Sequence, residues 1–175
     1  MRALGLLIAA GTVAVGCAHA PKTAAQRSEV DQRAIDALTQ MEAKDPGLRP
    51  LLDQSAGYIV FPTIGQGGLV VGGASGRGVA FERGQVVGYV DLTQGSFGAQ
   101  IGGQSFAELI IARDPAAWQK MRSGSFEFGG HASATVVRTG AAAEGQFTNG
   151  VAVFVQPRGG AMLNASLTGQ RLKFL

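Results

Sequence analysis

The chain has 175 residues, of which 15 are Lys or Arg, 12 are Asp or Glu, 27 are Gly and only one is Cys. This length supports a single domain that folds without disulfide bonds or structural metal ions. A hydrophobic content of 46% excludes disorder of the whole chain. A net charge of +3 is too small for a protein that wraps nucleic acid, so no nucleic-acid partner is expected. One Cys excludes an intramolecular disulfide and a Cys-rich zinc site. The sequence predicts no metal site and no cofactor.

The N-terminus has the pattern of a bacterial secretion signal. Arg2 precedes an apolar run from Ala3 to Val15, which is shorter than the roughly 20 residues that span a bilayer. The following Ala14-Val15-Gly16-Cys17 resembles a lipobox, in which cleavage precedes the Cys and its thiol is acylated. The other cleavage site, Ala18-His19-Ala20, is followed by Pro21, whose ring fits poorly after a scissile bond.

We therefore predict a signal peptide over residues 1–16, a tether over residues 17–26 and one domain over residues 27–175. Cys17 is the predicted lipid attachment site, carrying palmitate or similar acyl chains. Two or more such chains anchor a protein stably, at ~0.8 kcal/mol per buried CH₂. The predicted location is the bacterial envelope after export across the inner membrane, on the outer membrane facing the periplasm.

Helical signals occupy the first third of the mature chain. Ser28 and Asp31 have the spacing of a capping box. The next apolar residues recur every three or four positions, as on one face of an amphipathic helix; they are Val30, Ala34, Ala37, Leu38 and Met41. Asp45-Pro46-Gly47 ends this helix, and a second short helix is predicted over residues 48–54.

From Gly57 onward, short runs of branched and aromatic residues predict strands. Gly65, Gly76, Gly84 and Gly95 are predicted at turns. Asp114-Pro115 predicts the start of a short helix that continues through Met121. The predicted strands cover residues 58–61, 67–74, 79–82, 86–92, 97–102, 106–113, 125–129, 132–138, 151–156 and 161–167, with residues 170–174 as an edge strand.

The fold class that follows is α+β. One or two N-terminal amphipathic helices precede a mainly antiparallel, curled β-sheet that resembles a barrel or a sandwich, with one short inserted helix. The nearly continuous apolar run over residues 106–113 predicts a buried central strand. Glu108 interrupts this run, and we expect its side chain to face solvent or to pair with Arg113.

Two motifs resemble catalytic or phosphate-binding sequences without the required context. The glycine-rich residues 72–78 lead into a strand and not a helix, so a hairpin and a glycine-lined sheet are predicted in place of a phosphate loop. Ser105 follows Gly103-Gln104 as in a nucleophile elbow, but the predicted strand continues through it. His131 is the one base that the domain offers. No catalytic residue is predicted.

Basic residues around one tryptophan are candidates for lipid binding. Arg113, Lys120 and Arg122 flank Trp118 on the short helix, and tryptophan with basic neighbours suits the headgroup region of a membrane. The alternative interpretation packs Trp118 onto the sheet. Arg77, in the glycine-rich segment, is a further candidate.

Ordered glycine blocks carry a resemblance to a known family. The blocks are Gly57-Tyr58-Ile59-Val60-Phe61-Pro62, Gly67-Gly68-Leu69-Val70-Val71-Gly72-Gly73, Gly76-Arg77-Gly78-Val79, Gly98-Ala99-Gln100-Ile101-Gly102-Gly103 and Gly160-Ala161-Met162-Leu163-Asn164-Ala165-Ser166. Together they resemble the SYLF domain, also called the Ysc84-type lipid-binding domain, from about Ala34 to the C-terminus. The resemblance implies a phospholipid-binding module, and bacterial members are often secreted or lipoproteins.

The resulting hypothesis is a non-enzymatic envelope lipoprotein that binds phospholipid, with anionic headgroups favoured. The alternative is a protein-interaction module tethered to the envelope by its acylated Cys17, with an envelope protein as partner. Two weaker hypotheses are a small outer-membrane β-barrel, with which the unbroken run Leu109-Ile110-Ile111 agrees poorly, and a hydrolase that uses Ser105.

Overall fold

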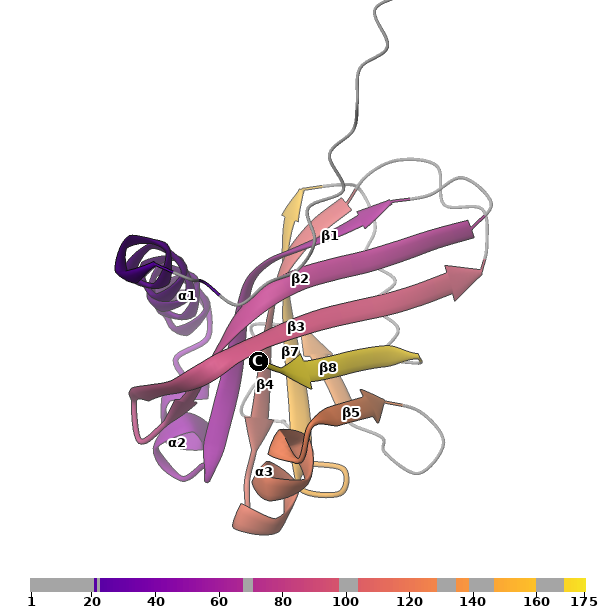
Figure 1. Cartoon of the computed structure of the whole chain (residues 1–175). Coiled ribbons are helices and arrows are strands. Elements are labelled where there is room, and N and C mark those ends of the chain that lie inside the picture. The colour runs from indigo at the N-terminus through magenta and orange to yellow at the C-terminus, as the bar shows by residue number, and fades with distance from the viewer. Residues whose placement is uncertain are drawn as a thin grey trace, which may run out of the picture.

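The computed structural model describes residue 21 and residues 23–67, 71–97, 104–128, 135–138, 147–159 and 169–175. Cys17, His131 and the strand predicted over residues 161–167 lie outside these ranges. Within them, an N-terminal helical segment is followed by a curled, mainly antiparallel sheet with a short inserted helix (Figure 1). The predicted α+β class is confirmed.

Two helices precede the sheet, α1 (Ala24–Lys44) and α2 (Leu48–Asp53). The helix predicted to be capped by Ser28 is capped five residues earlier, because Thr23 and Gln26 form the capping box. The Gln26 amide donates to Thr23 Oγ1 at 3.1 Å, and the Thr23 amide donates to Gln26 Oε1 at 3.3 Å. Residues 24–26, predicted as tether, are therefore helical. The predicted apolar face of α1 is confirmed, since all five of its residues pack into one core cluster.

The described strands form one eight-stranded sheet in the order β5-β8-β3-β2-β1-β4-β7-β6. All neighbours are antiparallel except β6 and β7. The strands are β1 (Gly57–Gly67), β2 (Val71–Glu82), β3 (Gln85–Phe97), β4 (Gln104–Ala112), β5 (Ser125–Phe128), β6 (Thr135–Arg138), β7 (Val151–Gly159) and β8 (Gln170–Phe174). Helix α3 (Pro115–Arg122) is inserted between β4 and β5, as Asp114-Pro115 predicts.

Three glycines predicted at turns lie inside strands. Gly65, Gly76 and Gly95 belong to β1, β2 and β3, and the two strands predicted on either side of Gly76 are one continuous strand. The hairpin predicted in this glycine-rich segment is therefore wrong. A Cβ at Gly76 would lie 2.8 Å from Ile64 Cγ1. The glycine makes room for a side chain of the adjacent strand and does not reverse the chain.

Strand β8 was predicted at an edge of the sheet, but it lies between β3 and β5. It pairs with Val90–Gln94 of β3 on one side and with Ser125–Phe128 of β5 on the other. In β1, a bulge over Phe61–Ile64 adds one residue relative to both neighbours and contains Pro62. Proline is tolerated there because a bulge leaves a residue outside the hydrogen-bonded ladder.

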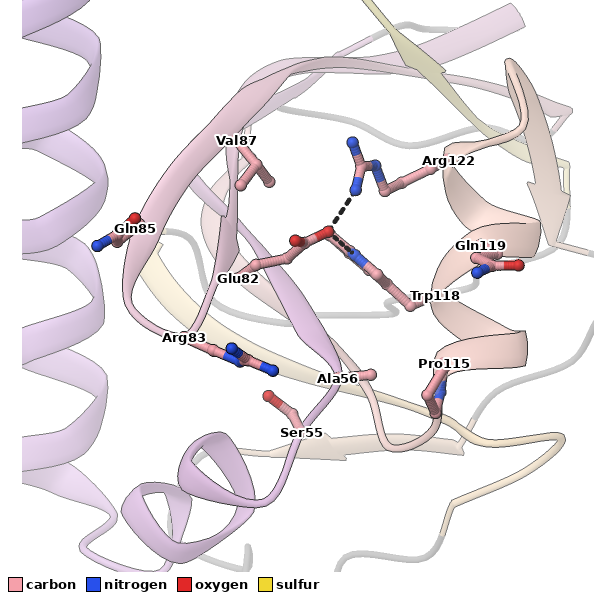
Figure 2. Close-up of a pocket in the computed structure, with 10 residues that line it drawn as sticks. All are labelled: Ser55, Ala56, Glu82, Arg83, Gln85, Val87, Pro115, Trp118, Gln119 and Arg122. Carbon is pink, nitrogen blue, oxygen red and sulfur yellow. Dashed lines mark hydrogen bonds and ion pairs between the residues drawn. The ribbon is translucent and has the colours of Figure 1, made fainter.

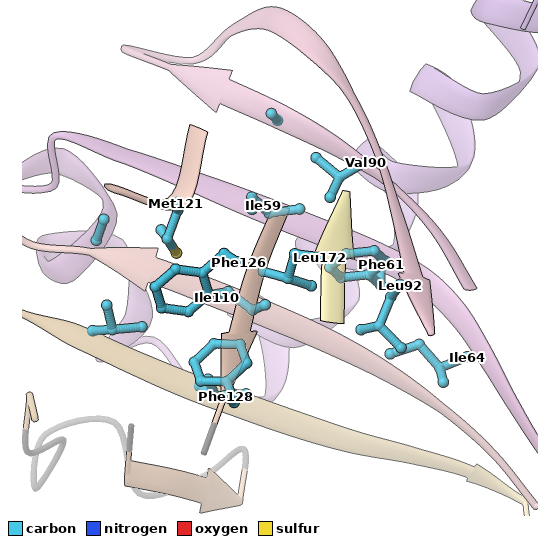
Figure 3. Packing of buried hydrophobic residues seen from close by; sticks show 14 of the residues in the cluster. Ile59, Phe61, Ile64, Val90, Leu92, Ile110, Met121, Phe126, Phe128 and Leu172 are labelled. Carbon is cyan, nitrogen blue, oxygen red and sulfur yellow. The ribbon is translucent and has the colours of Figure 1, made fainter. Parts of the chain in front are cut away.

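Alternate residues of the central strands enter two separate cores. The inner core lies inside the curl of the sheet and joins residues of β1 and β4 to residues of α3, β5 and β8, including Ile59, Ile110, Met121, Phe126 and Leu172 (Figure 3). The outer core lies on the opposite face, beneath α1 and α2. Because β4 is buried on both faces, its sequence is a continuous apolar run and not an alternating one. The predicted buried central strand is confirmed.

The hairpin between β2 and β3 turns on Arg83 and Gly84, whose φ angles are 50° and 77°. Two residues with positive φ are typical of a type I′ turn, which matches the twist of the paired strands.

Replacing Gly84 with Ala should lower the free energy of unfolding by about 1 kcal/mol, because an L-residue is strained at positive φ. Gly65 is the matched control, since neither glycine has an atom within 4 Å of its ideal Cβ and Gly65 does not have positive φ. Urea denaturation should show Gly65→Ala to be neutral or slightly stabilising. Equal losses in both variants would refute the role of backbone strain at Gly84.

Candidate functional site: a cleft beside the inserted helix

A cleft of about 770 Å³ lies between the β2–β3 hairpin and helix α3 (Figure 2). The hairpin contributes one wall, α3 the other, and the α2–β1 connection closes one end. The lining residues are Ser55, Ala56, Glu82, Arg83, Gln85, Val87, Pro115, Trp118, Gln119 and Arg122.

Glu82 joins the two walls of this cleft. Its carboxylate accepts hydrogen bonds from Trp118 Nε1 and from the Arg122 guanidinium (Figure 2). A charge-assisted bond of this kind is stronger than a neutral one. The contact therefore fixes the position of α3 relative to the tip of the hairpin.

Trp118 is only 4% exposed and belongs to the inner core. Its ring lies directly over Gly57, where a Cβ would lie 2.6 Å from Trp118 Cδ2. The edge of its ring also meets Phe174, with centroids 6.1 Å apart. The alternative interpretation, that Trp118 packs onto the sheet, describes this arrangement.

The structure separates the basic residues that the sequence grouped together. Arg122 turns into the cleft and pairs with Glu82, whereas Lys120 is exposed on the solvent face of α3. Arg113 is also exposed, and its guanidinium carbon lies 4.1 Å from the centre of the Phe147 ring. Such a cation–π contact orients a guanidinium without neutralising it.

Arg77 lies away from this group. It shares a face of β2 with Val79, which belongs to the outer core, and pairs with Asp91 on β3 at 3.0 Å. It also lines a small pocket with Val30 and Arg33 of α1. Arg77 is therefore on the opposite side of the sheet from α3.

Sequence reasoning missed Glu82 and Arg83 as residues of the cleft. Glu82 is the last residue of β2 and Arg83 is the first residue of the turn, and the one available signal was this charged pair immediately before Gly84. Only the tertiary structure places this turn next to α3, because the two segments are more than 30 residues apart in sequence.

Glu108 was predicted to face solvent or to pair with Arg113, and it does neither. It is 1% exposed, and it receives hydrogen bonds from Gln170 Nε2 at 3.0 Å to Oε1 and 3.2 Å to Oε2. Its partners on the adjacent strands, Phe61 and Val155, belong to the inner core. Burial raises the pKa of Glu108 to about 7, and the hydrogen bond from Gln170 opposes part of this rise.

This pKa predicts how stability depends on pH. Because the folded state holds the Glu108 proton more tightly than the unfolded state, its contribution is complete below pH 4.5 and is lost as pH rises to about 7. At 1.36 kcal/mol per pKa unit, the loss is about 3 kcal/mol. Urea denaturation across this range should show the loss in the wild type and not in Glu108→Gln. Identical pH profiles for the two proteins would contradict the assignment.

Ser105 lies within strand β4 and not at a strand-to-helix turn. The geometry of a nucleophile elbow is therefore not formed around it, and its proposed base His131 is outside the described residues. In the part of the chain that the structure describes, no three His, Cys, Asp or Glu side chains gather as a metal site requires. That part also has no helix with the length and apolar character to cross a bilayer.

Comparison with protein families matches residues 93–174 to Ysc84, described as a Las17-binding protein actin regulator. This part of the chain matches the Ysc84 domain family. The match confirms the family inferred from the glycine blocks over the region from β3 to β8, which includes α3, Glu108 and Gln170. The match supports a binding module in this region. No curated protein matches the chain.

Proposed function

We propose that this protein is a non-enzymatic envelope lipoprotein whose Ysc84 domain binds anionic phospholipid. Acyl chains on Cys17 hold the protein to a membrane, and the headgroups are contacted by Lys120 on the solvent face of α3 and by Arg113, which precedes this helix. The family description mentions Las17 and actin regulation. We do not extend either to a protein of the bacterial envelope.

The main support is the orientation of α3. Its apolar residues Trp118 and Met121 are buried, so Lys120 is directed to solvent, and Arg113 before the helix is also exposed. Neither basic group has a carboxylate partner among the described residues. Their charge is therefore available to an anionic surface, whereas that of Arg122 is matched by Glu82.

The basic residues and the acyl chains would bind the membrane with different strengths. Each basic residue near an anionic membrane surface contributes about 1 kcal/mol, an attraction that salt screens. Acyl chains contribute much more through burial of their CH₂ groups. The anchor would hold the protein at the membrane, and the basic face would orient the domain on it.

Vesicle co-sedimentation tests the basic face, using residues 21–175 so that no acyl chain is present. We expect binding to phosphatidylglycerol vesicles that fades at high salt, and little binding to phosphatidylcholine vesicles. Reversal of both charges in Arg113→Glu with Lys120→Glu should weaken binding at least about tenfold.

The matched control reverses two exposed charges on α1, Arg33→Glu with Lys44→Glu, which changes net charge equally on the other side of the sheet. This control should retain most of the binding. If both double variants lose binding equally, net charge and not the α3 face is responsible. If no protein sediments with any vesicle, the lipid-binding proposal fails.

Acylation of Cys17 is tested separately. Mass spectrometry of the mature protein from a bacterial membrane fraction should show an N-terminal Cys17 that carries at least two acyl chains. Cys17→Ser should abolish both the modification and the membrane association. A mature N-terminus at Pro21 without lipid would overturn the anchor.

A further inference from the structure

Strand β3 has an open edge beside the cleft. Strand β8 pairs only with Val90–Gln94 of β3, and the last contact on this side is the bond from the Leu175 amide to the Tyr89 carbonyl at 3.0 Å. Residues 85–88 of β3 therefore have no strand partner on this side within the described part of the chain. An unpaired strand edge is a template for another extended chain.

This open segment is apolar as well as exposed. Val86 and Val87 are 39% and 37% exposed, although most valines of the described strands are buried. Val87 lies at a bulge and has no paired residue on β2, because Phe81 pairs with Val86 and Ala80 pairs with Gly88. Of the two valines, Val87 alone lines the cleft, and its side chain is directed into it (Figure 2).

The facing wall of the cleft supplies polar and cationic groups. Gln119 of α3 and Gln85 of β3 both line the cleft, and both residues are exposed. Arg122 is matched by Glu82, but Arg83 has no carboxylate partner among the described residues. The lining therefore carries a net positive charge.

We propose that this cleft binds an extended, acidic segment of a partner protein. The segment lies along residues 85–88 of β3 as a short added strand in line with β8. One of its apolar side chains packs on Val87, and an acidic side chain pairs with Arg83. An open strand edge favours a peptide over a lipid headgroup, because only a peptide backbone supplies alternating donors and acceptors at strand spacing.

Trp118 is the one tryptophan of the chain and lines the cleft, so its fluorescence reports occupancy directly. The purified full chain is titrated with a blocked hexapeptide of alternating Glu and Val. We expect a saturable change in Trp118 emission. A peptide of alternating Lys and Val should bind about tenfold more weakly, equivalent to about 1.4 kcal/mol.

Two neighbouring variants make the test specific. Val87→Asp places a charge in the cleft and should abolish the response to the acidic peptide. Val86→Asp adds the same charge at a residue of similar exposure that does not line the cleft, so its response should equal that of the wild type. Both sites are exposed, and unchanged urea denaturation of the two variants verifies their folding.

Three results would overturn the proposal: no saturable response to the acidic peptide, equal binding of the basic peptide, or an unaffected Val87→Asp variant. A response to phosphatidylglycerol vesicles in the absence of any response to the peptide would assign the cleft to lipid instead. The vesicle binding expected from Arg113 and Lys120 is measured independently, so either proposal can fail alone.

Discussion

Burial of the central strands on both faces is the constraint on which the rest of this structure depends. Alternate residues of β1 and β4 enter the inner and outer cores, and each face needs its own cover. Helices α1 and α2 cover the outer face of the sheet near β1 and β2 (Figure 1). Among the described residues, the inner face is covered by the short helix α3 together with β5 and β8, which the curl of the sheet brings over β1 and β4. The same curl brings Gln170 of β8 to Glu108 of β4, 62 residues earlier.

The position of α3 follows from that inner core and in turn creates the cleft. Trp118 and Met121 bury one face of the helix, and Glu82 ties it to the β2–β3 hairpin. This contact divides the basic residues into two groups with different surroundings. Arg122 is held inside the cleft, while Lys120 and Arg113 remain exposed at the surface. A lipid surface and an extended peptide would thus meet different sides of the same helix.

The errors in the sequence predictions have a common physical origin. Gly76 was interpreted as a turn residue, but its missing side chain leaves room for Ile64 of the neighbouring strand. The sequence does not show how closely two strands approach each other. Glu108 was expected at the surface because an isolated carboxylate is costly to bury. Its partner Gln170 belongs to a strand that pairs elsewhere in the sheet, so local sequence contained no sign of it. The cap at Thr23 was missed because Ser28 offered the same pattern a few residues later.

Local chemistry in the sequence was sufficient for the α+β class, the amphipathic face of α1, the Asp114-Pro115 start of α3 and the buried run of β4, because each depends on residues adjacent along the chain. The glycine blocks over residues 98–103 and 160–166 lie in the region that matches the Ysc84 family. Tertiary structure alone decided which strands are neighbours, that Trp118 is buried and that Arg122 pairs with Glu82. It also decided that residues 85–88 pair with no second strand in the part of the chain that the structure describes. These features depend on how far the sheet curls, and the curl is set by the packing of segments that are distant in sequence.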